Sequence, residues 1–170
     1  MLRRCCAGNS AINGDNSAGN GAGAAHFGRR ENLCRIGEEN AKLGTVHRYT
    51  EAGPGPVGSA MLVEFELNGQ KFSALNGGPQ FTFNESVSIV VPCADQAEVD
   101  SYWDRLSDGG QEIACGWLKD KYGLCWQIVP AVFFEMIAGP DPAAVARVMR
   151  AMMDMTRFDL AGLEQAYVGR

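Results

Sequence analysis

Residues 61–74 read MLVEFELNGQKFSA, and this stretch decides how the surrounding chain folds. Apolar and polar side chains alternate on both sides of Asn68-Gly69, a pair that is typical of a two-residue type I′ turn. The stretch is therefore predicted to be a β-hairpin. The turn fixes four cross-strand pairs, in which opposite charges and aromatic rings face each other: Leu67 with Gln70, Glu66 with Lys71, Phe65 with Phe72, and Glu64 with Ser73.

One more strand is predicted before the hairpin and a mixed unit after it. The first covers Lys42 to Tyr49 and ends before the loop Gly53-Pro54-Gly55-Pro56. In the later unit, Asp95 with Glu98 three residues on predicts a capped helix that ends at Gly109-Gly110. The apolar stripe of this helix is Val99, Tyr102, Trp103 and Leu106. The strands of this unit are predicted at 87–91, 112–117 and 124–129.

Helical patterns take over after Pro130. A short apolar segment covers residues 132–137, and Asp141-Pro142 predicts the start of another helix. Its stripe contains Met149 and Met152, which favours a core or subunit-interface position. Asp159 begins a final helical segment. We divide the chain into a Gly-rich tail at 1–39, a folded domain at 40–130 and a helical extension at 131–170.

The tail differs from the rest of the chain in charge and in pattern. The 170-residue chain carries a formal charge of -5, but residues 1–36 hold five Arg against Asp15 and Glu31, a net charge of +3. The remainder is therefore at -5 minus +3, or -8, which disfavours nucleic acid as a partner. The tail shows no helical or strand period, so we expect disorder, a misassigned start site or a reading-frame error, with a transit peptide no better supported than these errors.

Composition and cysteine spacing indicate the cellular compartment of the protein. Apolar residues make up 46% and charged residues 21% of the chain, as in soluble proteins, and no apolar run is long enough for a membrane span. The six cysteines include no C-x2-C pair and follow no secretory segment. We expect reduced thiols and a cytoplasmic protein.

Several longer strings carry a family resemblance. They are FELNGQKF at 65–72, ALNGGP at 74–79, EVDSYW at 98–103 and CGWLKDKYGLCWQIVP at 115–130. Together they are similar to the PhnB-like family, also labelled 3-demethylubiquinone-9 3-methyltransferase, of the glyoxalase/bleomycin-resistance/dioxygenase (vicinal oxygen chelate) superfamily. The resemblance implies an α+β fold in which two βαβββ modules form a cupped sheet around a ligand. The opening strand and helix of the first module have no counterpart in residues 1–36, so that module is expected to be incomplete.

The resemblance and the strand periods together suggest site residues. Period-2 alternation places Gln127 towards the cup. The resemblance implies a metal-binding carboxylate at this position. A neutral amide is a poor metal ligand, and His47 has polar neighbours, so we predict no metal and no cofactor. Glu64 is the candidate acid/base residue, although the base rate for Glu burial favours the alternative that it is a polar residue on an exposed hairpin face. The predicted ligand-binding residues are Ser73, Asn76, Ser88, Trp117, Cys125 and Gln127.

Three functional hypotheses follow. The first is a small-molecule binding protein that holds an apolar or aromatic ligand between Trp117, Trp126 and the hairpin. The second is an enzyme acting on a small carbonyl or quinone-like substrate through Glu64 or an acquired metal. The third is a defective or misannotated copy. Gly77-Gly78-Pro79 opens no helical pattern, so no methyl-donor motif is found. A homodimer is expected as the assembly.

Overall fold

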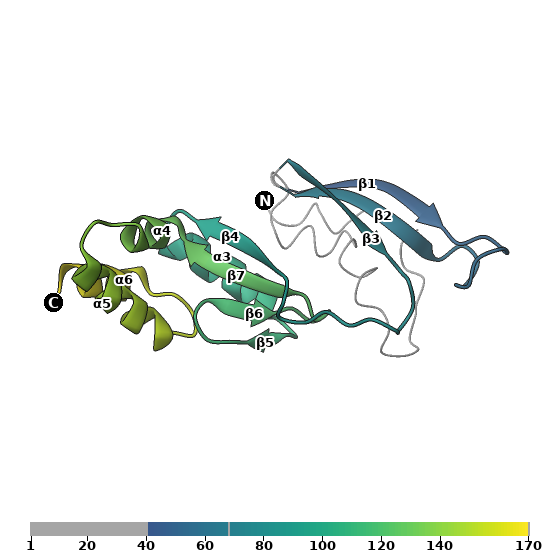
Figure 1. The fold of residues 1–170 in the computed structure, drawn as a ribbon. Helices are drawn as coiled ribbons and strands as arrows, with labels where there is room; N and C mark the ends of the chain where they lie inside the picture. The colour runs from purple at the N-terminus through teal and green to yellow at the C-terminus, as the bar shows by residue number, and fades with distance from the viewer. Residues whose placement is uncertain (1–40, 68, 170) are drawn as a thin grey trace. The chain divides into compact units, whose positions relative to one another are not determined.

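A computed structural model describes residues 41–67 and 69–169 (Figure 1). The predictions for residues 1–39, and for Asn68 at the hairpin turn, lie outside these residues. The chain forms two compact units, one ending at Thr82 and the other beginning at Phe83. Among the described residues, no helix has the length and apolar character needed to cross a membrane.

The first unit contains a three-stranded antiparallel sheet. Its strands are β1 (Ala41–Arg48), β2 (Ala60–Leu67) and β3 (Gln70–Leu75), in the order β1-β2-β3. The predicted hairpin register is confirmed in all four cross-strand pairs. Phe65 and Phe72 stack with their ring centroids 5.4 Å apart and nearly parallel. Gly69 has a φ of +80°, as the predicted turn requires.

The loop between β1 and β2 packs around one tyrosine. Tyr49 is buried, and its hydroxyl donates a hydrogen bond to the carbonyl oxygen of Asn76. A Cβ atom at Gly55 would lie 2.3 Å from the Tyr49 ring, so a glycine is needed where this loop crosses the ring. The loop thereby holds the end of β3 close to the end of β1.

The second unit opens with a complete βαβββ module. It consists of β4 (Ser88–Cys93), α3 (Gln96–Ser107), β5 (Gln111–Glu112), β6 (Trp117–Lys119) and β7 (Cys125–Pro130). The strand order is β4-β7-β6-β5, with β4 parallel to β7 and the other pairs antiparallel. The α+β class and the module expected from the sequence are confirmed. By contrast, the first sheet comprises only three strands among the described residues.

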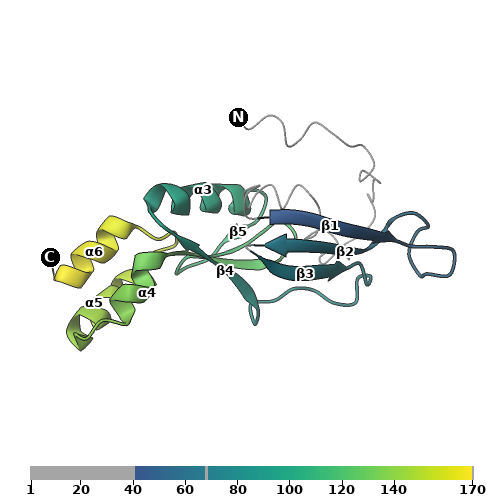
Figure 2. The ribbon, with the colours of Figure 1, turned by 90° about the horizontal axis from the view of Figure 1, so that it is seen from above.

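Helix α3 begins and packs as its sequence predicts. The Asp95 carboxylate accepts a hydrogen bond from the Glu98 N–H at 2.9 Å, and Glu98 accepts one from the Ala94 N–H at 2.7 Å. The reciprocal cap therefore reaches one residue further back than a standard capping box. Figures 1 and 2 show α3 covering one face of the four-stranded sheet. The predicted stripe is buried against that face: Val99, Tyr102, Trp103 and Leu106.

The strand predicted at 112–117 is wrong in its middle part. The chain leaves the ladder after Glu112 and rejoins it at Trp117, because Cys115 and Gly116 both have positive φ angles. Their backbone N–H groups donate instead to the carbonyl oxygens of Met155 and Thr156, at 2.7 and 2.8 Å. This excursion, residues 113–116, ties the sheet to the segment that follows α5.

Three helices complete the second unit. They are α4 (Ala131–Ile137), α5 (Pro142–Met153) and α6 (Leu160–Val168), and both ribbon views place them beyond one end of the sheet (Figures 1 and 2). The cap predicted at Asp141 is confirmed, since its carboxylate accepts a hydrogen bond from the Ala143 N–H at 2.9 Å. In α5, Val148 is buried, but Met149 is 39% exposed and does not belong to the core.

Candidate functional site

The strand register brings four of the predicted ligand-binding residues onto one face of the second sheet. Ser88 pairs with Cys125 across β4 and β7, while Trp117 pairs with Gln127 across β6 and β7. Paired residues point to the same side of a sheet, and positions two apart share that side. Ser88, Trp117, Cys125 and Gln127 therefore share the face opposite to α3, which we call the open face.

The opposite face belongs to the helix. Leu118 and Trp126 are a cross-strand pair and are almost completely buried. Glu112 shares this face through its pairing with Leu118, and its carboxylate accepts a hydrogen bond from Trp103 Nε1 of α3 at 2.7 Å. The bulky residues of β7 thus meet the helix, as predicted from the alternation.

This arrangement corrects one part of the ligand hypothesis. Trp126 was expected to contact a ligand together with Trp117, but it is 1% exposed and lies on the α3 side. Its Nε1 donates to Asp120 Oδ2 at 3.0 Å. Adjacent residues of a strand point to opposite faces, so the alternation within β7 is enough to show that Trp126 and Gln127 cannot contact the same ligand.

A hydrogen bond joins two polar side chains on the open face. Gln127 Nε2 donates to Ser88 Oγ over 2.7 Å, although the residues are 39 positions apart in the chain. Both side chains are half-buried. With this bond made, the hydroxyl proton of Ser88 remains as a donor and Oε1 of Gln127 as an acceptor. The pair can therefore orient a ligand that offers one acceptor and one donor.

Sequence reasoning missed an ion pair on the same face. Lys119 pairs with Cys125 across β6 and β7, and its Nζ lies 2.5 Å from Glu85 Oε1. The hydrogen bond from Lys119 holds the pKa of the Glu85 carboxyl below its ordinary value, and the same bond raises the pKa of the Lys119 ammonium. Glu85 precedes β4 by three residues, in a segment without periodicity, so no local pattern could have revealed the contact.

The thiol of Cys125, on the open face, is unreactive. Cys125 is fully buried, and burial raises the pKa of its thiol, with the Lys119 charge opposing the change. Cys93 is also fully buried, and burial raises its thiol pKa to about 12. A protonated thiol is a poor nucleophile, so Cys125 acts as part of the floor of the open face.

The remaining predicted residues lie in the first unit. Glu64 and Ser73 form a cross-strand pair, as predicted, beside a groove of about 420 Å³. The Glu64 side chain is 51% exposed, and its Oε1 lies 3.8 Å from Nε2 of His47. Its carboxylate is thus open to solvent. The groove is lined by Lys42, Leu43, Gly44, Glu64, Phe65, Glu66, Lys71, Phe72 and Ser73.

Asn76 has mainly structural contacts. Its backbone N–H donates to the carbonyl oxygen of Met61 at 2.8 Å, and its carbonyl oxygen accepts from the Tyr49 hydroxyl. Its side-chain Nδ2 donates to the carbonyl oxygen of Ala60 at 3.4 Å. These bonds fasten the end of β3 to the start of β2, which leaves Oδ1 for any ligand.

Comparison with known proteins decides the family. The profile of the family described as 3-demethylubiquinone-9 3-methyltransferase matches residues 37–129, which is more than half of the chain. The chain belongs to this family. The matched region contains the first sheet, α3 and the second sheet as far as Val129, so the PhnB-like resemblance of the hairpin and of residues 115–129 is confirmed.

A solved structure agrees with this assignment. A PhnB protein from Bacillus cereus that carries the same methyltransferase designation is 28% identical, with a TM-score of 0.57 over 65% of this chain and 94% of its own. A protein of known structure from Pseudomonas aeruginosa is 16% identical, with a TM-score of 0.48 over 62% of this chain and 87% of its own. A search of curated proteins gave no match.

The family is designated a methyltransferase family, but the described residues contain no loop of the kind that holds a methyl donor. A nucleotide-type donor is usually held by a Gly-rich turn that leads from a strand into a helix. Gly77-Gly78 does follow β3, but the next element is β4, and residues 76–87 contain no helix. These residues do not fit such a donor, and we derive no methyl-transfer step.

Proposed function

We propose that this PhnB-like protein binds a small aromatic molecule on the open face of its second sheet. The observation that carries the proposal is the hydrogen bond between Gln127 and Ser88, two half-buried polar side chains beside Trp117. A half-buried polar pair flanked by an aromatic ring and apolar strands is the usual composition of a ligand site. Val90, 45% exposed and paired with Gln127, adds apolar surface.

The ligand class follows from these groups. Trp117 offers an aromatic face, while Ser88 donates and Gln127 accepts, so an uncharged aromatic compound with an amide or phenol group fits best. The Lys119 charge is neutralised by Glu85, so the face does not select for a strong anion. Asn76 and Ser73, in the other unit, were also predicted as ligand residues and are not needed for this proposal.

A thermal-shift panel of aromatic amides and phenols tests the proposal. We expect at least one compound to raise the melting temperature of the full chain, and Gln127→Leu combined with Ser88→Ala to remove that shift. Ser73→Ala is the matched control and should keep it. If no compound stabilises the protein, or if the double variant still responds, the open face is not the binding site.

A second candidate function rests on the groove beside Glu64. A solvent-open carboxylate in a groove of about 420 Å³ could remove a proton next to the carbonyl group of a small carbonyl or quinone-like substrate. Exchange of the α-proton for deuterium, followed by NMR, reads out this step. Exchange should be lost in Glu64→Gln and kept in Glu51→Gln, an exposed carboxylate of the same unit outside the groove, and equal rates in both variants would rule the role out.

We also propose a cytoplasmic homodimer. Among the described residues, Cys93, Cys115 and Cys125 are free thiols, as expected in a reducing compartment. Two apolar residues of α4 and α5 are well exposed, Phe134 at 44% and Met153 at 64%. Exposed apolar surface supports self-association. Light scattering should give twice the chain mass, and a monomer at micromolar concentration would contradict the assembly.

A further inference from the structure

The groove beside Glu64 carries its charged groups on one face of the three-stranded sheet. Lys42, Glu66 and Lys71 are cross-strand neighbours on β1, β2 and β3, so their side chains leave the sheet on the same side. Glu64 and Ser73 form the next pair along the hairpin on that side. All five residues line the groove. The strand register therefore accounts for its polar lining.

A glycine leaves space beside the Glu64 side chain. A Cβ atom at Gly44 would lie 3.3 Å from Cβ of Glu64 and 3.1 Å from the Glu64 carbonyl oxygen. Across the hairpin, Glu64 faces Ser73, whose side chain is also short. Glu64 thus stands between two small residues, next to a row of long charged side chains. This difference in height gives the groove its volume of about 420 Å³.

One ion pair inside the groove leaves one ammonium group over. Lys42 Nζ lies 3.4 Å from Glu66 Oε1, so the Glu66 carboxylate is engaged on the β1 side. Lys71 lies on the other side of Glu66, and no carboxylate in the described part of the chain forms an ion pair with it. The groove therefore presents one uncompensated cation near the solvent-open carboxylate of Glu64.

The spacing of these two groups suits a small molecule. Lys71 and Glu64 are diagonal neighbours across the hairpin, a relation that puts their Cβ atoms roughly 7 Å apart. In an α-keto acid, the carboxylate and keto oxygens lie side by side, so one ammonium with three donors can bind both. The acidic C–H group is on the other side of the keto carbon. An acid bound to Lys71 in this way extends that C–H group towards Glu64.

We propose that the groove binds a small α-keto acid, with Lys71 holding its carboxylate and keto oxygens and Glu64 removing the proton next to the keto group. The inference rests on the proton removal proposed above for Glu64 and adds the class of substrate. The electron pair of the C–H bond forms the C=C bond of an enolate, the keto π pair moves to oxygen, and the proton passes to the Glu64 carboxylate. The Lys71 ammonium stabilises the charge on that oxygen.

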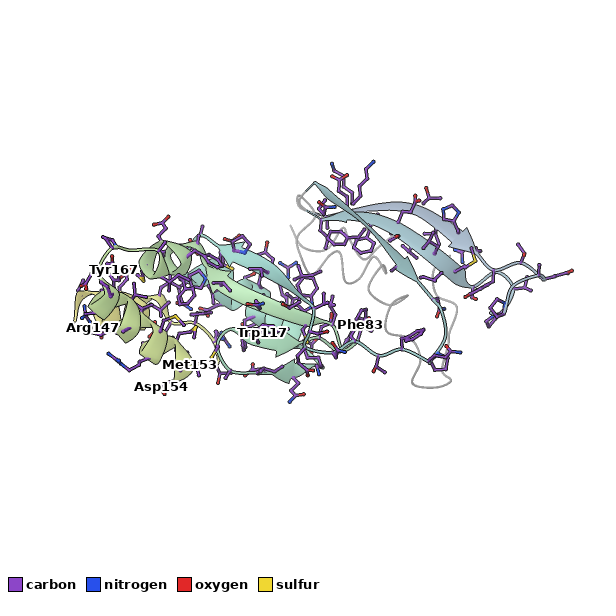
Figure 3. All side chains as sticks on the ribbon, in the orientation of Figure 1. Phe83, Trp117, Arg147, Met153, Asp154 and Tyr167 are labelled. Atoms are coloured by element: carbon purple, nitrogen blue, oxygen red, sulfur yellow. The ribbon has the colours of Figure 1, made fainter. Side chains whose placement is uncertain are left out.

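Exchange of the methyl protons of pyruvate in heavy water tests the inference on the full chain. Proton NMR is the readout, because tryptophan fluorescence reports on the other unit, where Trp117 lies in the second sheet (Figure 3). Methyl pyruvate is the uncharged counterpart, since it keeps the methyl and keto groups. We expect the KM for pyruvate to be about fivefold below that for the ester, the upper end for an exposed ion pair. Lys71→Met should bring the two KM values together.

Lys121→Met is the matched control, because it removes the same charge from an exposed lysine of the other unit and should keep the preference. Lys71 is also exposed, so its variant should fold normally, which far-ultraviolet circular dichroism verifies. Equal KM values in the wild type, or a preference that survives in Lys71→Met, overturn the recognition of the carboxylate while the proton removal by Glu64 stands.

Saturation-transfer NMR measures the binding of pyruvate separately from its exchange. Binding that is weakened in Lys71→Met, without any exchange in the wild type, supports the recognition of the carboxylate and overturns the proton removal by Glu64. A wild type that neither binds pyruvate nor exchanges its protons overturns both.

Discussion

A single side chain can hold a turn of this protein in place through hydrogen bonds to residues close to it in the sequence. Asp120 is the clearest case, since it is the one charged residue among the buried positions described. Its Oδ1 accepts from the N–H groups of Tyr122 and Leu124 at 2.9 and 3.1 Å, and its Oδ2 accepts from Trp126 Nε1. One carboxylate therefore both shapes the β6–β7 turn and orients a core tryptophan.

Replacing Asp120 by Ala should destabilise the second unit by about 3 kcal/mol, because buried donors lose a charged acceptor. Urea unfolding followed by fluorescence measures the change. Asp154→Ala, at an exposed position, should cost less than about 0.5 kcal/mol. Similar costs for the two variants would mean that the turn does not depend on the Asp120 carboxylate.

The buried thiol of Cys93 predicts a loss of stability in alkali. An unfolded thiol ionises near pH 8.5, whereas burial raises the pKa of Cys93 to about 12. Between these values the unfolded chain holds fewer protons than the folded chain, so the free energy of unfolding falls as pH rises. Below about pH 8.5 the contribution is constant.

Equilibrium unfolding of the wild type and of Cys93→Ala at pH 7 and pH 10.5 tests this. The wild type should lose more stability across the interval than the variant. Parallel losses in the wild type and Cys93→Ala would show that Cys93 ionises as easily in the folded chain as in the unfolded one.

At the scale of elements, the 113–116 excursion joins the sheet to the chain after α5. Gly116 has a φ of +76°, and a Cβ atom there would lie 2.3 Å from the Phe158 ring and 2.9 Å from the carbonyl oxygen of Ile128. The Phe158 ring in turn packs against Phe133 of α4, with ring centroids 5.1 Å apart. The Phe158 ring and the Ile128 carbonyl therefore pack so closely against Gly116 that only a hydrogen atom fits in place of a Cβ atom.

Gly116→Ala should therefore cost more than about 3 kcal/mol, since both backbone strain and a steric clash arise. Gly123→Ala separates the two causes. Gly123 also has a positive φ, at +88°, but nothing lies within 4 Å of its Cβ position, so strain alone should cost about 1 kcal/mol. Thermal unfolding of both variants gives the comparison, and equal costs would refute the close packing at Gly116.

Elements whose determinants are local were predictable from the sequence. The hairpin follows from alternation and one turn dipeptide, and α3 follows from its cap and its four-residue stripe. The 113–116 excursion was not predictable, because its backbone bonds go to Met155 and Thr156, some 40 residues away. The side of β7 on which Gln127 lies follows from local alternation and was predictable. The Lys119 contact with Glu85 joins residues 34 positions apart and was not.

At the scale of the whole molecule, each unit has its own core. The three tryptophans, at positions 103, 117 and 126, all belong to the second unit, while the first unit relies on a smaller cluster around Phe65, Val63 and Ala74. A three-stranded sheet of this size is close to the lower limit of independent stability. The two units should therefore differ in stability.

Unfolding followed by two probes tests this difference. Tryptophan fluorescence reports only on residues 83–169, and far-ultraviolet circular dichroism reports on both sheets, so we expect the dichroism transition to begin at lower urea concentration. Phe72→Trp adds a reporter to the first unit and should follow that early phase. Coincident midpoints for all three signals would show that the chain unfolds as one cooperative body.

The position of β4 at the border of its sheet has a further consequence for handling the protein. Pro92 lies near the end of β4, opposite Val129, and proline has no N–H to donate. A strand from another molecule that added along this border would meet a gap in the ladder. Pro92→Val would restore the missing donor and extend the β-branched run that begins at Ile89, which would favour fibril growth during storage.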